Sequence, residues 1–380
     1  MYLCMVAIPA YQQAFTVDRG DASLPYTWVM LGFGVGGMII GRLVDRFGIV
    51  KPLMIATVLL TLSFFAAARA PSFAIFAGLH AVIGACGCAA VFSPLLADIS
   101  RWFVVRRGFA IAICASGNYL AGTIWPPFME YTISSSGWQA TYDAFAWMSI
   151  LCMLPLLSIL TRRPPDHSAE VPSGGSAGSP KSLGLSSIQL TALLCGAGVG
   201  CCMAMAMPQA HVLALTVDLG FSPAHGAEML SLMFGCGVIS RLAFGWLSDR
   251  IGGLATLLLS SMLQCLSLMI FLPAQGLYAL YVASALFGLF QGGIVPCYAL
   301  IVREYFPARE AGFRTGIVVF ATLVGMAFGG WLSGVIYDWQ GDYTLAFVNS
   351  IGWNLLNIAV IGMLWLKARP GANNLNLGTT

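Results

Sequence analysis

One arginine lies inside an apolar stretch of the chain, GCGVISRLAFGWLSDR at residues 235–250. Arg241 precedes the charged pair Asp249–Arg250 by eight residues, which is about 12 Å along an α-helix. Its guanidinium is permanently charged and presents a planar fork of donors that matches a carboxylate. The first chemistry that the sequence offers is therefore the binding of an anion.

The composition places Arg241 inside a lipid bilayer. The 380 residues are 58% hydrophobic and only 9% charged, with a mean hydropathy of +0.83, whereas soluble domains carry about 25% charged residues. Apolar runs of about 20 residues recur, long enough to cross a bilayer as helices and too long for the strands of a membrane β-barrel. We therefore expect an all-α membrane protein. An arginine at the middle of its hydrocarbon core costs roughly 2.5–3.5 kcal/mol even on lenient scales.

The sequence supplies no carboxylate that could neutralise Arg241 at this depth. Glu228 lies thirteen residues earlier on the same expected helix, about 20 Å away. The other acidic residues near apolar spans fall at the span ends: Asp98, Glu130, Asp143 and Asp338. The remaining partner is the carboxylate of a ligand. The alternative is that cavity water and backbone carbonyls solvate the guanidinium.

Further polar residues within the spans could line a cavity around the ligand. His211 follows the helix-breaking Pro208 and could accept a proton or donate to a carboxylate, although an interface histidine bonded to backbone fits equally well. The other candidates for substrate binding are Tyr11, Gln12, Asn118, Tyr119, Gln291 and Tyr298. Each of these could instead hold neighbouring helices together.

Several kinds of chemistry are not indicated. The eleven cysteines lie in apolar spans without a CxxC pair, which is typical of small core residues rather than disulfides or metal ligands. The sequence shows neither a phosphate-binding loop nor a cluster of catalytic residues. We expect no metal, no cofactor, no enzyme activity and no nucleic-acid partner, and a monomer surrounded by lipid.

Glycine, proline and charged residues divide the sequence into twelve apolar spans. They cover residues 1–16, 26–47, 51–69, 72–98, 106–130, 140–161, 187–215, 223–247, 253–273, 277–303, 310–336 and 343–367. Residues 162–186 are rich in Pro, Gly and Ser and predict a flexible linker between six-helix halves at 1–161 and 187–370, with a disordered tail at 371–380. The first span is short for a crossing, so we expect the natural first helix to begin further upstream.

Lysine and arginine are distributed unequally over the two sides of the expected bundle. Fifteen lie in loops after even-numbered spans, in the linker or in the C-terminal region, and only Arg19 and Arg69 lie on the opposite side. Basic loops face the cytoplasm. The bias therefore predicts a cytoplasmic linker and C-terminus, and we expect the protein in a bacterial inner membrane.

Two short segments repeat one pattern, G-x-L-x-D-R-x-G. They read GRLVDRFG at 41–48 and GWLSDRIG at 245–252, each closes the second span of its half, and they lie 204 residues apart. In this alignment Arg241 falls opposite Gly37, so its charge is not part of the shared scaffold. The pattern resembles the signature of the Major Facilitator Superfamily. That resemblance implies two pseudo-symmetric halves that rock around a central substrate site.

The resemblance gives the two signatures a gating role. They consist of Gly41, Asp45, Arg46 and Gly48 in the first half and of Gly245, Asp249, Arg250 and Gly252 in the second. We expect Gly41 and Gly245 to let a neighbouring helix approach closely. Asp45 and Asp249 can cap the next helix or pair with nearby arginines, forming a charge latch that holds the outward-open state. The alternative is a role in topology and folding alone.

Within the superfamily, RLAFGWLSDRIG resembles the eighth helix of monocarboxylate transporters and of the bacterial oxalate/formate antiporter, where an arginine binds the carboxylate. RWFVVRRGFAIAICASGNYLAG (101–122), GWQATY (137–142) and AHVLALTVDLGF (210–221) also resemble that branch. Three positions depart from it. Ala10 and Gly237 stand where animal carriers have a lysine and an aspartate, and Thr322 stands where the oxalate exchanger has a second cation.

These observations favour a secondary transporter that moves small organic anions, most of all monocarboxylates, by alternating access. A proton or a counter-anion could drive it. The alternatives are an exporter of drugs or sugars with the same fold and a transporter-like sensor of organic anions. The sequence leaves the substrate, the direction of transport and the coupling ion open.

Overall fold

The computed structural model describes residues 1–103, 107–161 and 183–368, and the regular structure within these ranges is helical. Most of the expected linker at 162–186 and the whole expected tail at 371–380 lie outside the described residues. Ten helical segments within these ranges are long and apolar enough to cross a membrane. The protein is thus an integral multi-pass membrane protein.

The N-terminal half contains six crossing segments. Its helices are α1 (Tyr2–Val6), α2 (Ile8–Phe15), α3 (Arg19–Ala22), α4 (Leu24–Phe47), α5 (Val50–Ala68), α6 (Phe73–Ile83), η1 (Gly84–Ala89), α7 (Ala90–Trp102), α8 (Arg107–Met148), η2 (Ser149–Met153), α9 (Leu154–Leu157) and η3 (Ile159–Thr161). The pair α1–α2 forms the first segment, and α6, η1 and α7 form one continuous rod. Non-helical backbone at Gly137 (φ 85°) divides α8 into two segments, so the long rod crosses twice.

The C-terminal half contains the other six segments. Its helices are α10 (Ser187–Asp218), α11 (Pro223–Ile251), α12 (Gly253–Phe271), α13 (Leu277–Gln291), α14 (Ile294–Tyr305), α15 (Ala308–Gln340) and α16 (Thr344–Ala368). Helices α13 and α14 together make one span, Leu277–Tyr305. The two halves therefore give the twelve transmembrane helices that the sequence predicts.

Capping residues explain where the helices of the second half begin. The Ser186 hydroxyl accepts from the Gln189 backbone N–H (3.2 Å), and the Gln189 side chain accepts from the Ser186 N–H (3.0 Å), which forms a capping box. Ser222 caps α11, and Pro223 follows at the first helical position. These start signals place Arg241 in the last third of α11.

The repeat is visible in the backbone itself. Among the described residues, positive φ angles occur at Thr16, Gly48 and Gly137 in the first half and at Gly220, Gly252 and Gly341 in the second, alongside Gly184 before α10. The three pairs 16/220, 48/252 and 137/341 are each separated by 204 residues, the spacing of the signature repeat. Left-handed backbone favours glycine, so the turns preserve the symmetry. Positions 48 and 252 mark one end of the bundle, called the signature end below; the other four mark the far end.

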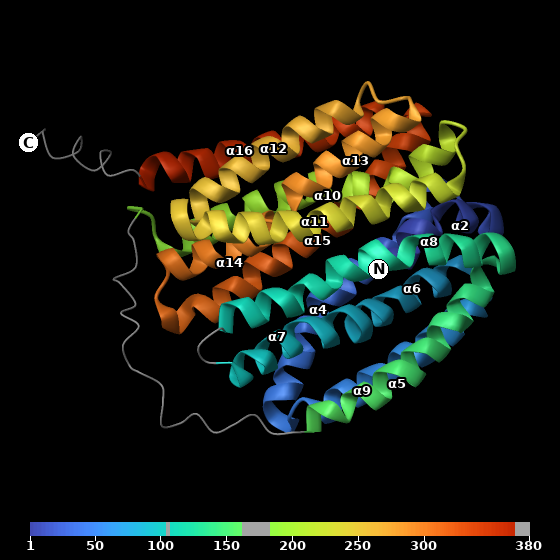
Figure 1. Cartoon of the computed structure of the whole chain (residues 1–380), viewed down its shortest axis with the longest axis horizontal. Coiled ribbons are helices and arrows are strands. Elements are labelled where there is room, and N and C mark those ends of the chain that lie inside the picture. The colour runs from blue at the N-terminus through green and yellow to red at the C-terminus, as the bar shows by residue number, and fades with distance from the viewer. Residues whose placement is uncertain (104–106, 162–182, 369–380) are drawn as a thin grey trace, which may run out of the picture.

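The two halves lie side by side, the first coloured blue to green and the second yellow-green to red (Figure 1). Across the seam between them, α4 packs against α15 and α8 packs against α11. Glycines permit this close approach. A Cβ at Gly330 of α15 would lie 2.7 Å from the Tyr26 ring, and one at Gly237 of α11 would lie 2.4 Å from the Tyr119 ring.

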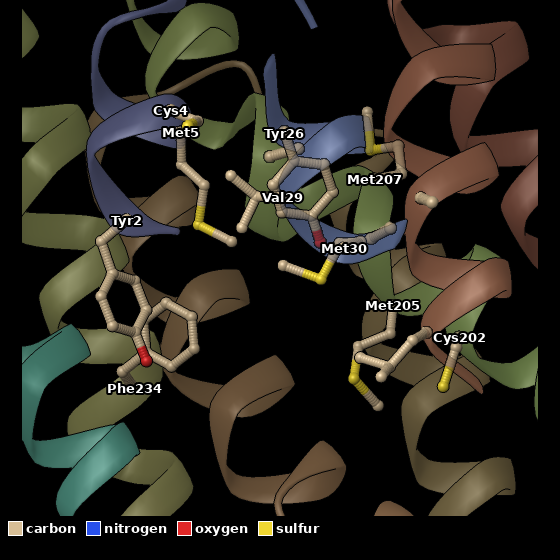
Figure 2. Close-up of a cluster of buried hydrophobic side chains, with 14 of the residues drawn as sticks. Tyr2, Cys4, Met5, Tyr26, Val29, Met30, Cys202, Met205, Met207 and Phe234 are labelled. Atoms are coloured by element: carbon tan, nitrogen blue, oxygen red, sulfur yellow. The ribbon is translucent and has the colours of Figure 1, made fainter. Parts of the chain in front are cut away.

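Sulfur-containing side chains fill much of the seam. Figure 2 shows a buried cluster from α1, α4, α10 and α11: Tyr2, Cys4, Met5, Tyr26, Val29, Met30, Cys202, Met205, Met207 and Phe234. All eleven cysteines of the chain are free thiols, and six of them are buried, as expected for core residues. Because thioether chains adapt to irregular gaps, this packing can rearrange when the halves move.

Candidate functional site

Arg241 bridges the two halves at the seam. Its Nη1 donates to the carbonyl oxygen of Ala115 on α8 (3.0 Å). Its guanidinium carbon lies 4.1 Å from the centroid of the Tyr119 ring, also on α8. The ring fits there because Gly237, one turn before Arg241, has no side chain. The space that a side chain at position 237 would fill is thus occupied by the ring of Tyr119.

The charge of Arg241 is not balanced by any carboxylate that the structure describes. In the parts of the chain that the structure describes, no carboxylate forms a salt bridge with Arg241, and its Nε is buried without a hydrogen-bond partner. A cation–π contact contributes only about 0.5–2 kcal/mol. Ring and carbonyl together hold the guanidinium in place, but its positive charge remains available to an anion.

Two residues without a predicted role complete the surroundings of Arg241. The Tyr2 hydroxyl donates to the Asn118 carbonyl (2.6 Å) and to its Oδ1 (2.9 Å). The Phe234 ring packs edge-on against Tyr2 (4.9 Å between centroids) and Tyr119 (5.6 Å). We call Tyr2, Asn118, Tyr119, Phe234 and Arg241 the Arg241 cluster. Phe234 could have been found from sequence, because it precedes Arg241 by two helical turns on the same face.

Gln291 lies beside the same helix. Its Oε1 accepts from Gln209 Nε2 (2.6 Å), and its own Nε2 is buried without a described partner. The next residue, Gly292, donates its N–H to the Ser240 hydroxyl of α11 (3.1 Å). Ser240 is the neighbour of Arg241, so Gln291 is close in the fold to the anion-binding candidate.

Tyr298 belongs to a packing network inside the second half. Its hydroxyl donates to Asn357 Oδ1 (3.0 Å), and Asn357 Nδ2 donates to the Ser261 hydroxyl (2.7 Å). Asn354 donates to the Ser261 carbonyl (2.9 Å) in the same place. These bonds link α12, α14 and α16, so the structure gives Tyr298 the helix-joining role that was the alternative.

Tyr11 is likewise held within the first half. Its hydroxyl bonds to the Tyr142 hydroxyl (2.5 Å), which in turn bonds to His80 Nε2 (2.6 Å). His80 Nδ1 donates to the Phe76 carbonyl (2.7 Å), which fixes the direction of the chain of bonds. Gln12 is half-buried at the end of α2. The structure does not bring Tyr11 into contact with the Arg241 cluster.

His211 is fully buried and both of its ring nitrogens have partners. Nε2 donates to the Gly330 carbonyl (2.7 Å), so Nδ1 accepts from the Tyr343 hydroxyl (3.1 Å). The same Tyr343 hydroxyl accepts from Arg19 (2.7 Å). Of the two roles considered from sequence, the structure supports an interface histidine bonded to backbone, far along the seam from the Arg241 cluster.

The signature residues require a correction. A Cβ at Gly41 or Gly245 would meet nothing within 4 Å, so the expected close approach of a neighbouring helix is absent in this conformation. Gly48 and Gly252, in contrast, have φ angles of 76° and 83° that require glycine.

The charged signature residues are Asp45, Arg46, Asp249 and Arg250, and all four are exposed. Among the described residues they form no salt bridge across the seam. Arg250 instead lies over the Trp246 ring of its own helix, 3.9 Å from the centroid. Within the described ranges, the expected charge latch is therefore not formed in this conformation.

Thr322 packs against α10. It is almost fully buried, and a Cβ at Gly198 of α10 would lie 3.0 Å from its methyl group. A lysine at position 322 would thus be driven into the α10–α15 contact of the second half. The described residues contain no group of three or more His, Cys, Asp or Glu able to hold a metal ion.

A bundle of two repeated six-helix halves with an arginine at their seam is typical of alternating-access transporters. Residues 1–208 and 192–379 match the family model described as Major Facilitator Superfamily. The chain belongs to the Major Facilitator Superfamily.

Relatives of several kinds share this fold. The chain is 26% identical to the MFS-type transporter YcxA of Bacillus subtilis, over 87% of this chain and 83% of that protein. It is 27% identical to monocarboxylate transporter 13 of Rattus norvegicus, over 69% and 60%. It is 26% identical to the fujikurins efflux protein of Gibberella fujikuroi, over 78% and 63%. Among solved structures, the nucleoside transporter NupG has the same fold, with a TM-score of 0.70 at 14% identity, covering 96% of this chain and 95% of that one.

Proposed function

We propose that this chain is a secondary transporter of small monocarboxylates in which Arg241 binds the carboxylate. The observation that carries the proposal is the guanidinium at the seam, which has an unpartnered Nε and no carboxylate among its described partners. An incoming carboxylate would supply both the missing charge and the missing acceptor. The relationship to rat monocarboxylate transporter 13, whose name states this substrate class, supports the choice.

The residues around Arg241 have distinct proposed roles. Tyr119 orients the guanidinium of Arg241, and the hydrogen bond from the Tyr2 hydroxyl fixes the side chain of Asn118. Gln291 offers an unpartnered Nε2 as a second donor to the ligand. We do not assign direct ligand contacts to the remaining candidates, His211, Tyr298, Tyr11 and Gln12, because the described contacts of the first three lie elsewhere and Gln12 lies at the end of α2.

The test is carboxylate counterflow into proteoliposomes together with equilibrium binding of the same compounds. Arg241→Ala should abolish uptake and binding while the protein still reaches the membrane, because the cation serves the ligand rather than the fold. Arg241→Lys should restore little, since an ammonium lacks the bidentate fork. Arg303→Ala, which removes an exposed arginine of α14, is the matched control. Normal carboxylate uptake by Arg241→Ala would refute the proposal.

We further propose that the signature end, the linker at 162–186 and the C-terminus face the cytoplasm of a bacterial inner membrane. The distribution of basic residues supports this, with fifteen on that side and two on the other. The proposed division is 1–161 and 187–370, working as a monomer with a proton or a counter-anion as the coupling partner. Protease cleavage of the linker in inside-out vesicles, but not in right-side-out cells, tests the orientation.

Export of a larger metabolite is the second candidate function. The fujikurins efflux protein, a 26% identical relative, favours it. Transport by Arg241→Ala distinguishes the two proposed functions, because an exporter of neutral compounds would retain its activity in this variant. A monocarboxylate carrier would lose it.

A further inference from the structure

Arg19 joins the two halves at the far end of the seam. It belongs to the first half, on α3, yet only 6% of it is exposed. Its Nη1 and Nη2 donate to the two carboxylate oxygens of Asp218 on α10 (2.9 and 3.0 Å). Nη1 also donates to the Tyr343 hydroxyl (2.7 Å) at the start of the last crossing. A bidentate, largely desolvated pair of this kind is strongly oriented.

The backbone around Arg19 is held by the second half as well. Asp338 of α15 accepts from the N–H groups of Arg19 (2.8 Å) and Gly20 (2.6 Å). The guanidinium carbon lies 4.4 Å from the centroid of the Tyr337 ring. Gly334 allows the approach, since a Cβ there would lie 2.8 Å from the Arg19 carbonyl oxygen. Two acidic residues of the second half therefore fix one short segment of the first.

The network continues from Arg19 into the seam. Tyr343 donates to His211, and His211 donates to the Gly330 carbonyl on α15. Gly330 is the residue against which the Tyr26 ring of α4 packs. A line of hydrogen bonds thus runs from the far end to the place where the inner helices of the two halves meet.

The signature end shows the opposite situation. Gly41 and Gly245 have open space beside them, and Asp45 and Asp249 are exposed. Charge and hydrogen bonds thus join the halves at the far end, whereas at the signature end Asp45 and Asp249 form no ion pair with any residue that the structure describes.

We propose that Arg19, with Asp218, Asp338 and Tyr343, is the latch that holds the far end closed, and that it must break for the transporter to open to that side. The latch and the signature residues act alternately. When the contacts of Arg19 hold the far end closed, the signature residues of the two halves are separated, and the reverse holds in the other conformation. Loss of the Arg19 contacts therefore shifts the population toward the conformation in which the signature end is closed. This inference holds whichever molecule is carried.

The test is hydrogen exchange of the protein in lipid nanodiscs, compared between variants without substrate. Arg19→Ala should accelerate exchange at the far end, in peptides covering 19–27 and 330–343, by about tenfold, within the range typical of coupling between sites. It should slow exchange at the signature end, in 41–52 and 245–256. Asp218→Asn, which keeps the side-chain shape, should do the same, and Arg19→Ala/Asp218→Asn should add little to either.

Arg69→Ala is the matched control. Arg69 also makes a bidentate pair at the far end, with Asp143 (2.6 and 3.1 Å), but both residues belong to the first half. Its loss should leave the signature end unchanged. Faster exchange at both ends in Arg19→Ala and Asp218→Asn would show general destabilisation and would overturn the proposed latch. A change confined to the far end, or no change at either end, would overturn it as well.

Discussion

At the scale of single residues, Arg241 shows how a bundle of helices keeps a cation at its centre without neutralising it. A carbonyl on α8 and the face of Tyr119 compensate part of the charge, and Gly237 provides the space for that ring. A carboxylate partner would hold the arginine more strongly but would compete with an anionic ligand. The aromatic face orients the guanidinium and leaves its charge free.

Replacing Tyr119 tests this arrangement. Tyr119→Leu removes the ring face, and we expect monocarboxylate binding to weaken by about 2- to 30-fold, the equivalent of roughly 0.5–2 kcal/mol. Tyr119→Phe keeps the face and should bind nearly as well as wild type. Isothermal titration of the purified protein with lactate and pyruvate measures both. Equal losses in the two variants would mean that the hydroxyl, not the ring, is what matters.

At the scale of elements, the four glycines of the two signatures separate into two classes. Gly48 and Gly252 form turns that only glycine adopts easily, whereas Gly41 and Gly245 face open space in this conformation. A glycine that is unused in one conformation has a packing role only if another conformation closes on it. We therefore expect Gly41 and Gly245 to come into contact with a neighbouring helix only when the signature end closes.

Gly41→Val should consequently leave folding intact and block transport. The added side chain meets nothing in the present conformation, but it would obstruct the approach of a helix when the signature end closes. Thermal unfolding and counterflow of one preparation separate the two effects. Gly352→Val on α16, where a Cβ also meets nothing within 4 Å, is the control and should transport normally.

Asp45→Asn addresses the charge of the same element. Asp45 is exposed here, and we expect it to act when the signature end closes. We expect a lower turnover with little change in equilibrium binding, because the substitution acts on the movement and not on the Arg241 cluster. Initial transport rates and equilibrium binding constants, measured on one preparation, distinguish an effect on turnover from an effect on binding. Weakened binding with unchanged turnover would place Asp45 at the substrate site instead.

At the scale of the whole molecule, two arginines of the described seam differ: Arg241 has no carboxylate partner among the described residues, whereas Arg19 is paired with Asp218. Nη1 and Nη2 of the latch arginine are paired with Asp218 and Tyr343. We therefore expect the site to neutralise one carboxylate, that of a ligand at Arg241. A second carboxylate would enter the seam unpaired, at a cost of several kcal/mol.

We therefore expect 2-oxo acids, 2-hydroxy acids and short fatty acids to bind better than oxalate or succinate. The preference should be large, since each kcal/mol of unpaired charge weakens binding about fivefold. Competition of unlabelled acids against labelled lactate, at a pH where both carboxylates are ionised, measures it. Stronger competition by dicarboxylates than by their monocarboxylate analogues would require a second cation at the site.

The sequence by itself determined the architecture. Hydropathy, the glycine, proline and charged residues between the spans, and the signature repeat were enough to predict twelve helices in two halves. Crossing a bilayer fixes the length and composition of each helix locally. It also singled out Arg241, since a charge in an apolar span is visible without any neighbour. Gly41 and Gly245 were interpreted as packing residues, because the sequence does not say which conformation the halves adopt.

Only the tertiary structure decided which polar residues meet. The sequence offered Tyr298, Tyr11 and His211 as binding candidates beside Asn118 and Gln291, and only the structure shows which helices each of them joins. Arg19 was counted as one loop charge among others, but the fold buries it against residues about 200 and 320 positions away. Such pairings depend on how two halves dock, and docking is fixed by the shape of the whole seam rather than by any local pattern.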